Sequence, residues 1–259
     1  MAHRILVLSP LHNLGSSVCS ALLAQGSTYG GRSSALVFTD QMSPLPRYLG
    51  LEETVQDPTR NVTQIMELID AAAIANSDIL NYAHIYSKNA YLVNTADASL
   101  NEKVLGQTVE YIFDRITTDV VVCDCSDAFD TAMTKRLVDL AHMVFIVTDM
   151  SEKCIRHLSY WLKQQPLVDC PNVFVIVNRY DEAISSLRDF AKKIGLPASR
   201  VCKYHYNPWI GKCCLNKQLH TILPLSMSLD YRVAALKNDV DEMNQAISSD
   251  MLIKAKKGF

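Results

Sequence analysis

The sequence contains few of the residues that are typical of disordered or fibrous chains. Only 9 of its 259 residues are glycine and 9 are proline, which excludes a low-complexity or collagen-like chain. An excess of basic residues is also missing, since 25 lysines and arginines face 27 acidic residues. The formal charge of −2 gives no general attraction for nucleic acid, so we do not expect a nucleic-acid partner.

Long hydrophobic runs are missing as well. The first apolar run, residues 5–8, is too short for the hydrophobic region of a signal peptide. No run approaches the roughly 18 apolar residues that a transmembrane helix needs. We therefore expect a cytoplasmic protein. With 49% hydrophobic residues, the chain is able to form the core of one large α/β domain.

Eight cysteines are present, but their spacing does not indicate a metal site. In a reducing compartment they are most simply small core residues. Zinc ligands are usually paired at close spacing such as C-x₂-C, and here only Cys202 and His205 come near that pattern. We therefore expect no structural zinc. The cluster considered for it comprises Cys202, His205, Cys213, Cys214 and His220.

Short apolar runs alternate with segments of helical spacing along the chain. The runs predict strands at residues 5–8, 35–38, 91–94, 120–123, 144–148 and 173–177. The spacing predicts helices at residues 18–25, 63–74, 99–115, 129–141, 154–165 and 183–194. Continuous apolar strands belong to parallel sheets that are covered on both faces. We therefore predict a doubly wound, mainly parallel α/β fold with three layers, α/β/α.

One domain is predicted over residues 1–225. It is followed by a C-terminal helix and basic tail at residues 226–259, which pack on this domain or extend from it.

Two segments interrupt the alternation of strands and helices. Residues 40–53 are predicted to form a long loop with two prolines after the second strand. Residues 203–210 are predicted to form an aromatic loop after the last strand. Loops at the carboxyl ends of strands are where open α/β sheets bind ligands and partners.

The first strand is followed by a phosphate-binding loop that has lost its lysine. Residues 5–18 read as strand, polar turn and helix, which is the context that such a loop requires. In these loops the lysine contacts the outer phosphates and a Ser or Thr hydroxyl binds Mg²⁺. Gly15 and Ser17 fit the pattern, whereas Ser16 occupies the position of the lysine.

Three further segments complete a predicted nucleotide site. Asp124 ends an apolar strand, as the acid that holds Mg²⁺ does in P-loop enzymes, and would act there together with Ser17. Asn178 ends another strand and is suited to read a base edge, and residues 205–208 would close over the base. The predicted cofactor-binding residues are Gly15, Ser16, Ser17, Asp40, Asp124, Asn178, Arg179, Asn207 and Pro208.

In order and spacing, these segments resemble the ParA/MinD family of deviant P-loop ATPases, and within it the CpaE/TadZ and MinD branch. Residues 47–51, 113–124 and 178–180 support this branch, and the resemblance spans about residues 3 to 225. It implies a P-loop NTPase-like fold and binding of ATP or ADP with Mg²⁺. It also implies a homodimer and a protein partner in a larger assembly of the pilus, secretion, division or segregation type.

The loop departs from the family in a way that affects catalysis. The family reads Gly-Lys-Gly-Gly-Val-Gly-Lys-Thr, which places Leu11 at the early lysine and Ser16 at the second. In the family, the early lysine crosses between the two subunits of the dimer. Loss of the cation removes transition-state stabilisation of several kcal/mol. We therefore expect weak or lost nucleotide binding and absent or very slow hydrolysis, with Asp124 catalytic only if the chain is active.

Three functions remain open at this point. The first is a pseudo-ATPase that acts as a dimerising adaptor or positioning protein. The second is an active ATPase that recruits a cation from elsewhere, namely Arg32, Arg47, Lys135 or Arg179. The third is an unrelated α/β hydrolase with Ser16 or Ser17 as nucleophile, which the missing Gly-x-Ser-x-Gly pattern disfavours.

Two contact surfaces are predicted besides the nucleotide site. Leu11, Leu14 and residues 44–51 would form an apolar surface for dimerisation. Near the C-terminus, an apolar stripe predicts a helix that packs on the domain or on a second subunit; it comprises Val233, Leu236, Val240, Met243 and Ile247. Residues 251–259 form either a solvated tail, the favoured interpretation, or a tail that resembles the membrane-binding tails of MinD-type proteins.

Overall fold

An eight-stranded sheet forms the centre of the molecule, with strand order β3-β4-β2-β5-β1-β6-β7-β8. The computed structural model describes residues 2–29, 31–40, 43–57, 59–71, 73, 75–95, 102–125, 131–164, 170–227 and 233–257. The strands are β1 (His3–Leu8), β2 (Ser34–Phe38), β3 (His84–Ser87), β4 (Ala90–Asn94), β5 (Val120–Cys125), β6 (Met143–Thr148), β7 (Val173–Tyr180) and β8 (Val201–His205). Neighbouring strands are parallel except for β3 and β4.

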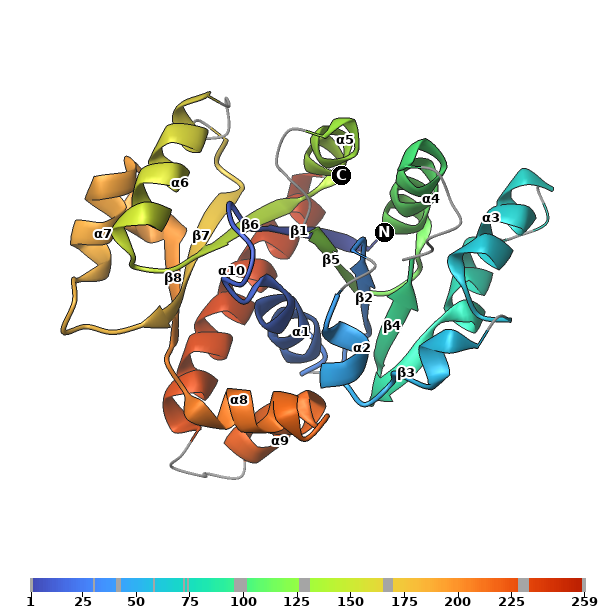
Figure 1. The fold of residues 1–259 in the computed structure, drawn as a ribbon. Coiled ribbons are helices and arrows are strands. Elements are labelled where there is room, and N and C mark those ends of the chain that lie inside the picture. The colour runs from blue at the N-terminus through green and yellow to red at the C-terminus, as the bar shows by residue number, and fades with distance from the viewer. Residues whose placement is uncertain are drawn as a thin grey trace.

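Helices cover both faces of the sheet (Figure 1). One layer holds α1 (Ser16–Gly26), α2 (Leu45–Tyr48), α8 (Pro208–Leu215), α9 (Ile222–Met227) and α10 (Ala234–Lys257). The other holds α3 (Val62–Asp70), α4 (Glu102–Arg115), α5 (Ala132–Leu140), α6 (Glu152–Gln164) and α7 (Leu187–Ile194). Short 3₁₀ helices are η1 (Thr54–Gln56), η2 (Asn76–Tyr82), η4 (Ala198–Arg200) and η5 (Leu219–Thr221). The predicted doubly wound, three-layer fold is confirmed.

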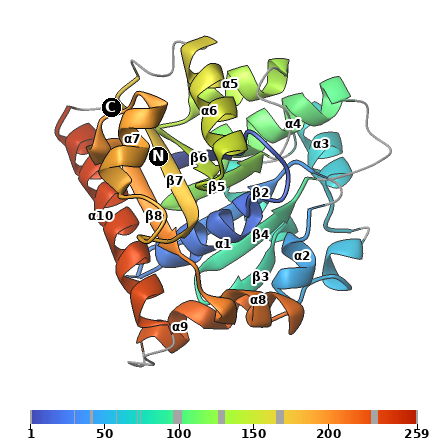
Figure 2. The same ribbon diagram turned by 60° about the vertical axis from the view of Figure 1, so that its left-hand side comes forward.

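Two apolar cores, one on each side of the sheet, hold these layers together. Every residue of β5 and β6 is buried, because both faces of these central strands are covered by helices. β1 lies between them. The chain leaves β1 through α1 on one face, toward β2, and leaves β5 through α5 on the other face, toward β6 (Figure 1 and Figure 2). The carboxyl end of β1 is therefore the point where doubly wound folds bind ligands.

Two strands were not predicted, and the aromatic loop at residues 203–210 was a wrong prediction. β8 includes Lys203–His205, and α8 begins at Pro208. β8 lies at the edge of the sheet, where Lys203 and His205 are only half-buried, so the strand lacks the continuous apolar run of a central strand. β3 is a short antiparallel edge strand that is joined to β4 by a tight turn at Asn89, which has φ 59°.

The predicted helices occur, with boundaries that local capping explains. The helix predicted at 183–194 begins only at Leu187, because the Ser186 hydroxyl accepts a hydrogen bond from the Asp189 N–H at 3.1 Å. The helix predicted at 63–74 ends at Asp70, and the loop predicted at 40–53 contains the short helix α2. Some predicted helix ends, at residues 74, 99–101, 129–130 and 165, lie outside the described residues.

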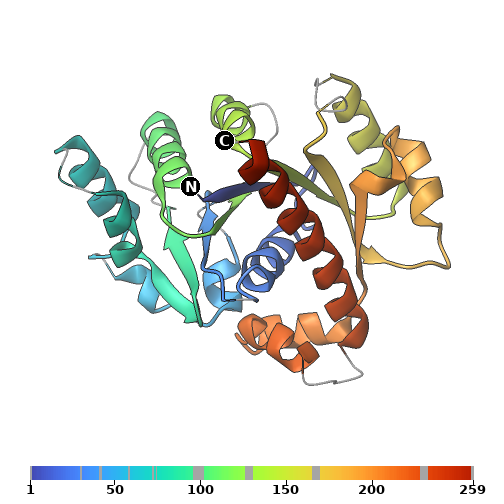
Figure 3. The same ribbon diagram turned by 180° about the vertical axis from the view of Figure 1, so that it is seen from behind.

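α10 packs along α1 and β8 on one face of the molecule (Figure 3). The predicted stripe is buried on this side, since Leu236 and Ile247 have no exposed surface. The Asn244 amide donates to the Gly26 carbonyl at 2.9 Å, which ties α10 to the end of α1. α10 continues to Lys257, and the end of the predicted membrane tail lies outside the described residues. Within the described part of the chain, no helix is long and apolar enough to cross a membrane.

Candidate functional site

The loop between β1 and α1 retains the shape of a phosphate-binding loop. Gly15 lies between the first strand and the first helix, as predicted, and caps α1 in the left-handed conformation with φ 86°. Asn13 is also left-handed, with φ 64°. At the start of the loop, the Ser9 hydroxyl donates to the Leu11 carbonyl at 2.7 Å. The first N–H groups of α1 have no helical partners of their own and are suited to bind an anion.

Asn178 connects this loop to the end of β7. Its Nδ2 donates to the Leu14 carbonyl at 2.8 Å, and its Oδ1 accepts from the Arg179 N–H at 2.9 Å. A Cβ atom on Gly15 would lie only 2.3 Å from Asn178 Nδ2, so the two residues fit only because Gly15 has no side chain. The amide that was predicted to read a base is therefore engaged with the protein itself.

Asp124 lies beneath the loop and is almost completely buried, with 1% of its surface exposed. Ser20 Oγ donates to its Oδ1 at 3.2 Å, whereas Oδ2 has no hydrogen-bond partner among the described residues. Burial raises the pKa of Asp124 to about 6. The Ser17 and Ser20 hydroxyls lower this pKa, and the negative charge of Asp40 raises it. An unpartnered buried carboxylate oxygen beside Ser17 fits an Mg²⁺ site, because Mg²⁺ prefers oxygen ligands.

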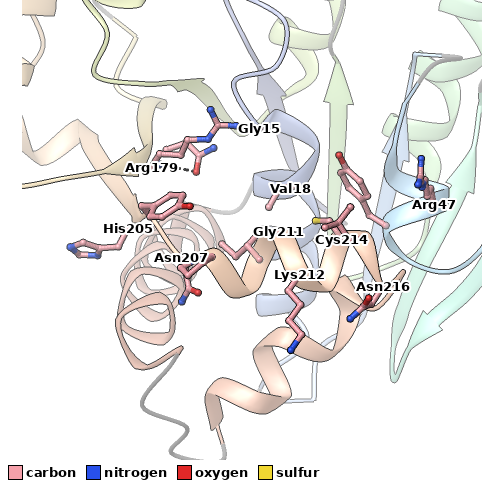
Figure 4. Close-up of a pocket in the computed structure, with 16 residues that line it drawn as sticks. Gly15, Val18, Arg47, Arg179, His205, Asn207, Gly211, Lys212, Cys214 and Asn216 are labelled. Atoms are coloured by element: carbon pink, nitrogen blue, oxygen red, sulfur yellow. Dashed lines mark hydrogen bonds between the residues drawn. The ribbon is translucent and has the colours of Figure 1, made fainter.

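A cavity of about 830 Å³ opens beside the loop (Figure 4). Its lining residues come from the start of α1, from α2, from the end of β7 and from α8. Five predicted site residues line it, namely Gly15, Asn178, Arg179, Asn207 and Pro208. The predicted residues Ser16, Ser17, Asp40 and Asp124 are not among its lining residues. The structure thus divides the predicted site residues into two groups. The five lining residues surround the cavity, and the other four lie at or near the Asp124 carboxylate beneath the loop.

The cavity lining is cationic. Arg47, Arg179 and Lys212 all contribute to it, and none of the described lining residues is aspartate or glutamate. Lys212 Nζ lies 4.1 Å from the centre of the Trp209 ring, which orients it by a cation–π contact. Asn207 caps α8, since its Oδ1 accepts from the Trp209 N–H at 2.9 Å. The arrangement suits an anionic ligand with an apolar part.

Several cavity residues were missed by sequence reasoning. Lys212, Leu215 and Asn216 belong to a segment with no recognisable motif, and only the fold places them beside the loop. Two of the four cations proposed for an active enzyme are not in the lining. Arg32 instead donates to Ser248 Oγ at 3.3 Å, and Lys135 lies on α5.

The apolar dimerisation surface predicted from Leu11, Leu14 and residues 44–51 is only partly exposed: Leu11 and Leu51 are half-buried, and three other leucines are buried. Leu14, Leu45 and Leu49 are 7%, 0% and 3% exposed, and the side chains of Leu45 and Leu49 belong to the apolar core beneath α2.

The cysteines and histidines that were considered for a zinc site lie at separate places in the fold, with Cys202 and His205 on β8 and Cys213 and Cys214 on α8. Among the described residues, no group of three or more His, Cys, Asp or Glu side chains is arranged to hold a metal ion.

No protein-family model and no curated protein sequence matches this chain. Solved structures do match it. A ParA family ATPase from Chlorobium tepidum has a TM-score of 0.71 at 16% identity, covering 94% of this chain and 99% of that one. MinD from Aquifex aeolicus, in a MinC:MinD cell division complex, has a TM-score of 0.70 at 14% identity, covering 95% and 96%.

MinD from Pyrococcus horikoshii, complexed with Mg-ADP, has a TM-score of 0.66 at 15% identity, covering 96% of this chain and 99% of that one. At such identities a structural match shows the fold and not the activity. This chain therefore has the P-loop NTPase-like fold that is found in ParA and MinD ATPases.

Proposed function

We propose that this protein is a ParA/MinD-like pseudo-ATPase that acts as a dimerising adaptor or positioning protein for a cellular assembly. The observation that carries the proposal is the contrast between the shape and the charge of the loop. Gly15 and Asn178 keep the loop in place, yet Leu11 and Ser16 stand where the family has lysines. A loop that is preserved in shape but has lost its catalytic cations fits nucleotide sensing better than turnover.

The remaining groups have defined roles in this proposal. The N–H groups at the start of α1 bind a phosphate oxygen of ATP or ADP, favoured by the helix dipole. Ser17 and Asp124 hold Mg²⁺, which neutralises phosphate charge when it is bound. Without a lysine in the loop we expect weak binding and absent or very slow hydrolysis.

Partners are proposed from the structural neighbours. The Aquifex aeolicus MinD structure is a complex with MinC, and the Pyrococcus horikoshii MinD structure contains Mg-ADP. By analogy, we propose that this chain forms a homodimer and binds a further protein of its assembly. The type of assembly and the CpaE/TadZ branch remain part of the proposal.

An active ATPase is the second candidate. The observation in its favour is that Arg47 and Arg179 line the same cavity as Gly15, so cations do lie on the loop side of the molecule. Such an enzyme would use one of these arginines in place of the missing lysine.

Steady-state ATP turnover separates the two candidates. We expect no turnover above background for the wild type, and no difference from Asp124→Ala. The control variant is Asp241→Ala, which alters a partly exposed aspartate on α10, remote from the loop. Turnover that is lost in Asp124→Ala and kept in Asp241→Ala would show an active enzyme. We also expect Ser16→Lys to strengthen nucleotide binding, since it restores the cation.

A further inference from the structure

Arg179, at the end of β7, has a strained backbone. Its φ of 54° is left-handed, a conformation that residues with side chains rarely adopt. The strain coincides with a shift in the β7–β8 register between Val177 and Tyr180. Such irregularities re-aim side chains and are frequent beside functional sites. Arg179 is exposed. The hydrogen bonds that Asp149 accepts from Ser151 lower the pKa of Asp149, and the positive charge of Arg179 helps to lower it.

Asn178 holds this strained residue against the phosphate-binding loop. Its Oδ1 accepts from the Arg179 N–H, and its Nδ2 donates to the Leu14 carbonyl. One amide therefore fixes the loop and the arginine in a single hydrogen-bonded unit. The distance between Leu14 and Asn178 is 164 residues along the chain, so this link is a property of the fold.

The charge of Arg179 acts on the loop. In Figure 4, Arg179 lies beside Gly15, and both line the cavity. Burial raises the pKa of Cys19 in the first turns of α1, and Asp124 adds to this effect, whereas the charge of Arg179 opposes it. The other two cations of the cavity, Arg47 and Lys212, lie well away from Gly15 in the same view.

We propose that Arg179, positioned by Asn178, supplies the positive charge that the loop lacks at Ser16, and that it binds the terminal phosphate of a nucleoside diphosphate or triphosphate. This proposal rests on the nucleotide binding proposed above. An arginine is suited to the role because its planar guanidinium stays charged and donates two parallel hydrogen bonds to phosphate oxygens. Asn178 is a positioning residue that does not contact the ligand.

Calorimetric titration with adenosine, AMP and ADP in the presence of Mg²⁺ tests the proposal. In the wild type, affinity should rise as phosphates are added. Arg179→Gly should weaken ADP binding by about tenfold or more, because a charge-assisted hydrogen bond is lost, and should leave adenosine binding unchanged. Since glycine accepts a φ of 54°, the thermal midpoint should not fall. Arg179→Lys should recover part of the ADP affinity.

Two further variants separate this role from a structural one. Asn89→Gly relieves the same kind of left-handed strain, at φ 59°, in the β3–β4 turn and should not change ADP binding. Asn178→Ala should weaken binding of ADP but not of adenosine, because it frees Arg179 without removing a contact to the base. Equal loss for both ligands would assign Asn178 to base recognition and overturn the positioning role.

The outcomes distinguish this proposal from the proposed function. If Arg179→Gly binds ADP as tightly as the wild type, the assignment of Arg179 fails while nucleotide binding stands. If the wild type shows no gain in affinity from adenosine to ADP, both fail together. ATP turnover that depends on Asp124 would overturn the pseudo-ATPase proposal alone.

Discussion

At the scale of single residues, Gly15 is constrained both by its backbone and by its neighbour. We expect Gly15→Ala to lower the free energy of unfolding by about 2–4 kcal/mol, since the new Cβ adds a clash with Asn178 to left-handed strain. Gly195→Ala is the matched control: its φ is 79°, and no atom lies within 4 Å of an added Cβ. Gly195→Ala should lower the free energy of unfolding by about 1 kcal/mol. Urea titration of both variants measures the two losses. Equal losses would show that the contact with Asn178 carries no energy.

Asp124 predicts a pH dependence of stability. Its pKa of about 6 in the folded protein lies above the ordinary aspartate value of 3.8, so the folded state binds the proton more tightly than the unfolded state does. The contribution of Asp124 to stability is therefore present at low pH and falls as pH rises from 3.8 to about 6, by about 3 kcal/mol.

Asp124→Asn should remove this fall. The stability of the variant relative to the wild type should therefore improve by about 3 kcal/mol between pH 4 and pH 7, measured by urea unfolding at each pH. Glu53→Gln makes the same chemical change at an exposed site and should show no such trend. Parallel curves for Asp124→Asn and the wild type would contradict the assignment.

At the scale of elements, the contact between α10 and β8 depends on a buried acid. Asp239 is 2% exposed, and its carboxylate accepts from the His205 backbone N–H at 2.8 Å and lies 2.9 Å from His205 Nδ1. Asp239→Ala should lower the free energy of unfolding by about 2–4 kcal/mol, because it removes a buried side chain and leaves the His205 backbone N–H and ring without their partner.

The same helix provides a control for this prediction. Asp241 pairs with Lys237 at a partly exposed position, so Asp241→Ala should lower the free energy of unfolding by less than about 1 kcal/mol. Similar losses from the two variants, measured in one denaturation series, would show that the buried contact does not secure α10.

At the scale of the whole molecule, the proposed dimer cannot use Leu14, Leu45 or Leu49 of the expected apolar surface, because these side chains are buried. Two large apolar side chains at the cavity, Tyr206 and Leu215, are 67% and 76% exposed. We expect light scattering to give a dimer at tens of micromolar protein, and Leu215→Lys to weaken it. Ile184 is 65% exposed and lies outside the cavity lining, so Ile184→Lys should not weaken the dimer. A strict monomer with and without ATP would contradict the dimer.

What the sequence alone determined is what depends on short-range patterns. Buried central strands read as continuous apolar runs, so all six predicted strands occur, including those at residues 120–123 and 144–148. The alternation of strands and helices was enough to predict a doubly wound fold, and the position of Gly15 between β1 and α1 followed from the same order. The helical spacing near the C-terminus likewise predicted which side of α10 is buried.

Only the tertiary structure decided which of these residues meet. Leu45 and Leu49 are buried because α2 packs on the apolar core. β8 lies at the edge of the sheet, so its sequence lacks the continuous apolar run by which the other strands were predicted. The contact of Asn178 with Leu14 joins residues that are far apart in sequence, and so does the contact of Asp239 with His205. Local periodicity carries no information about such pairs, because their energy arises only when the sheet and its helices have closed around them.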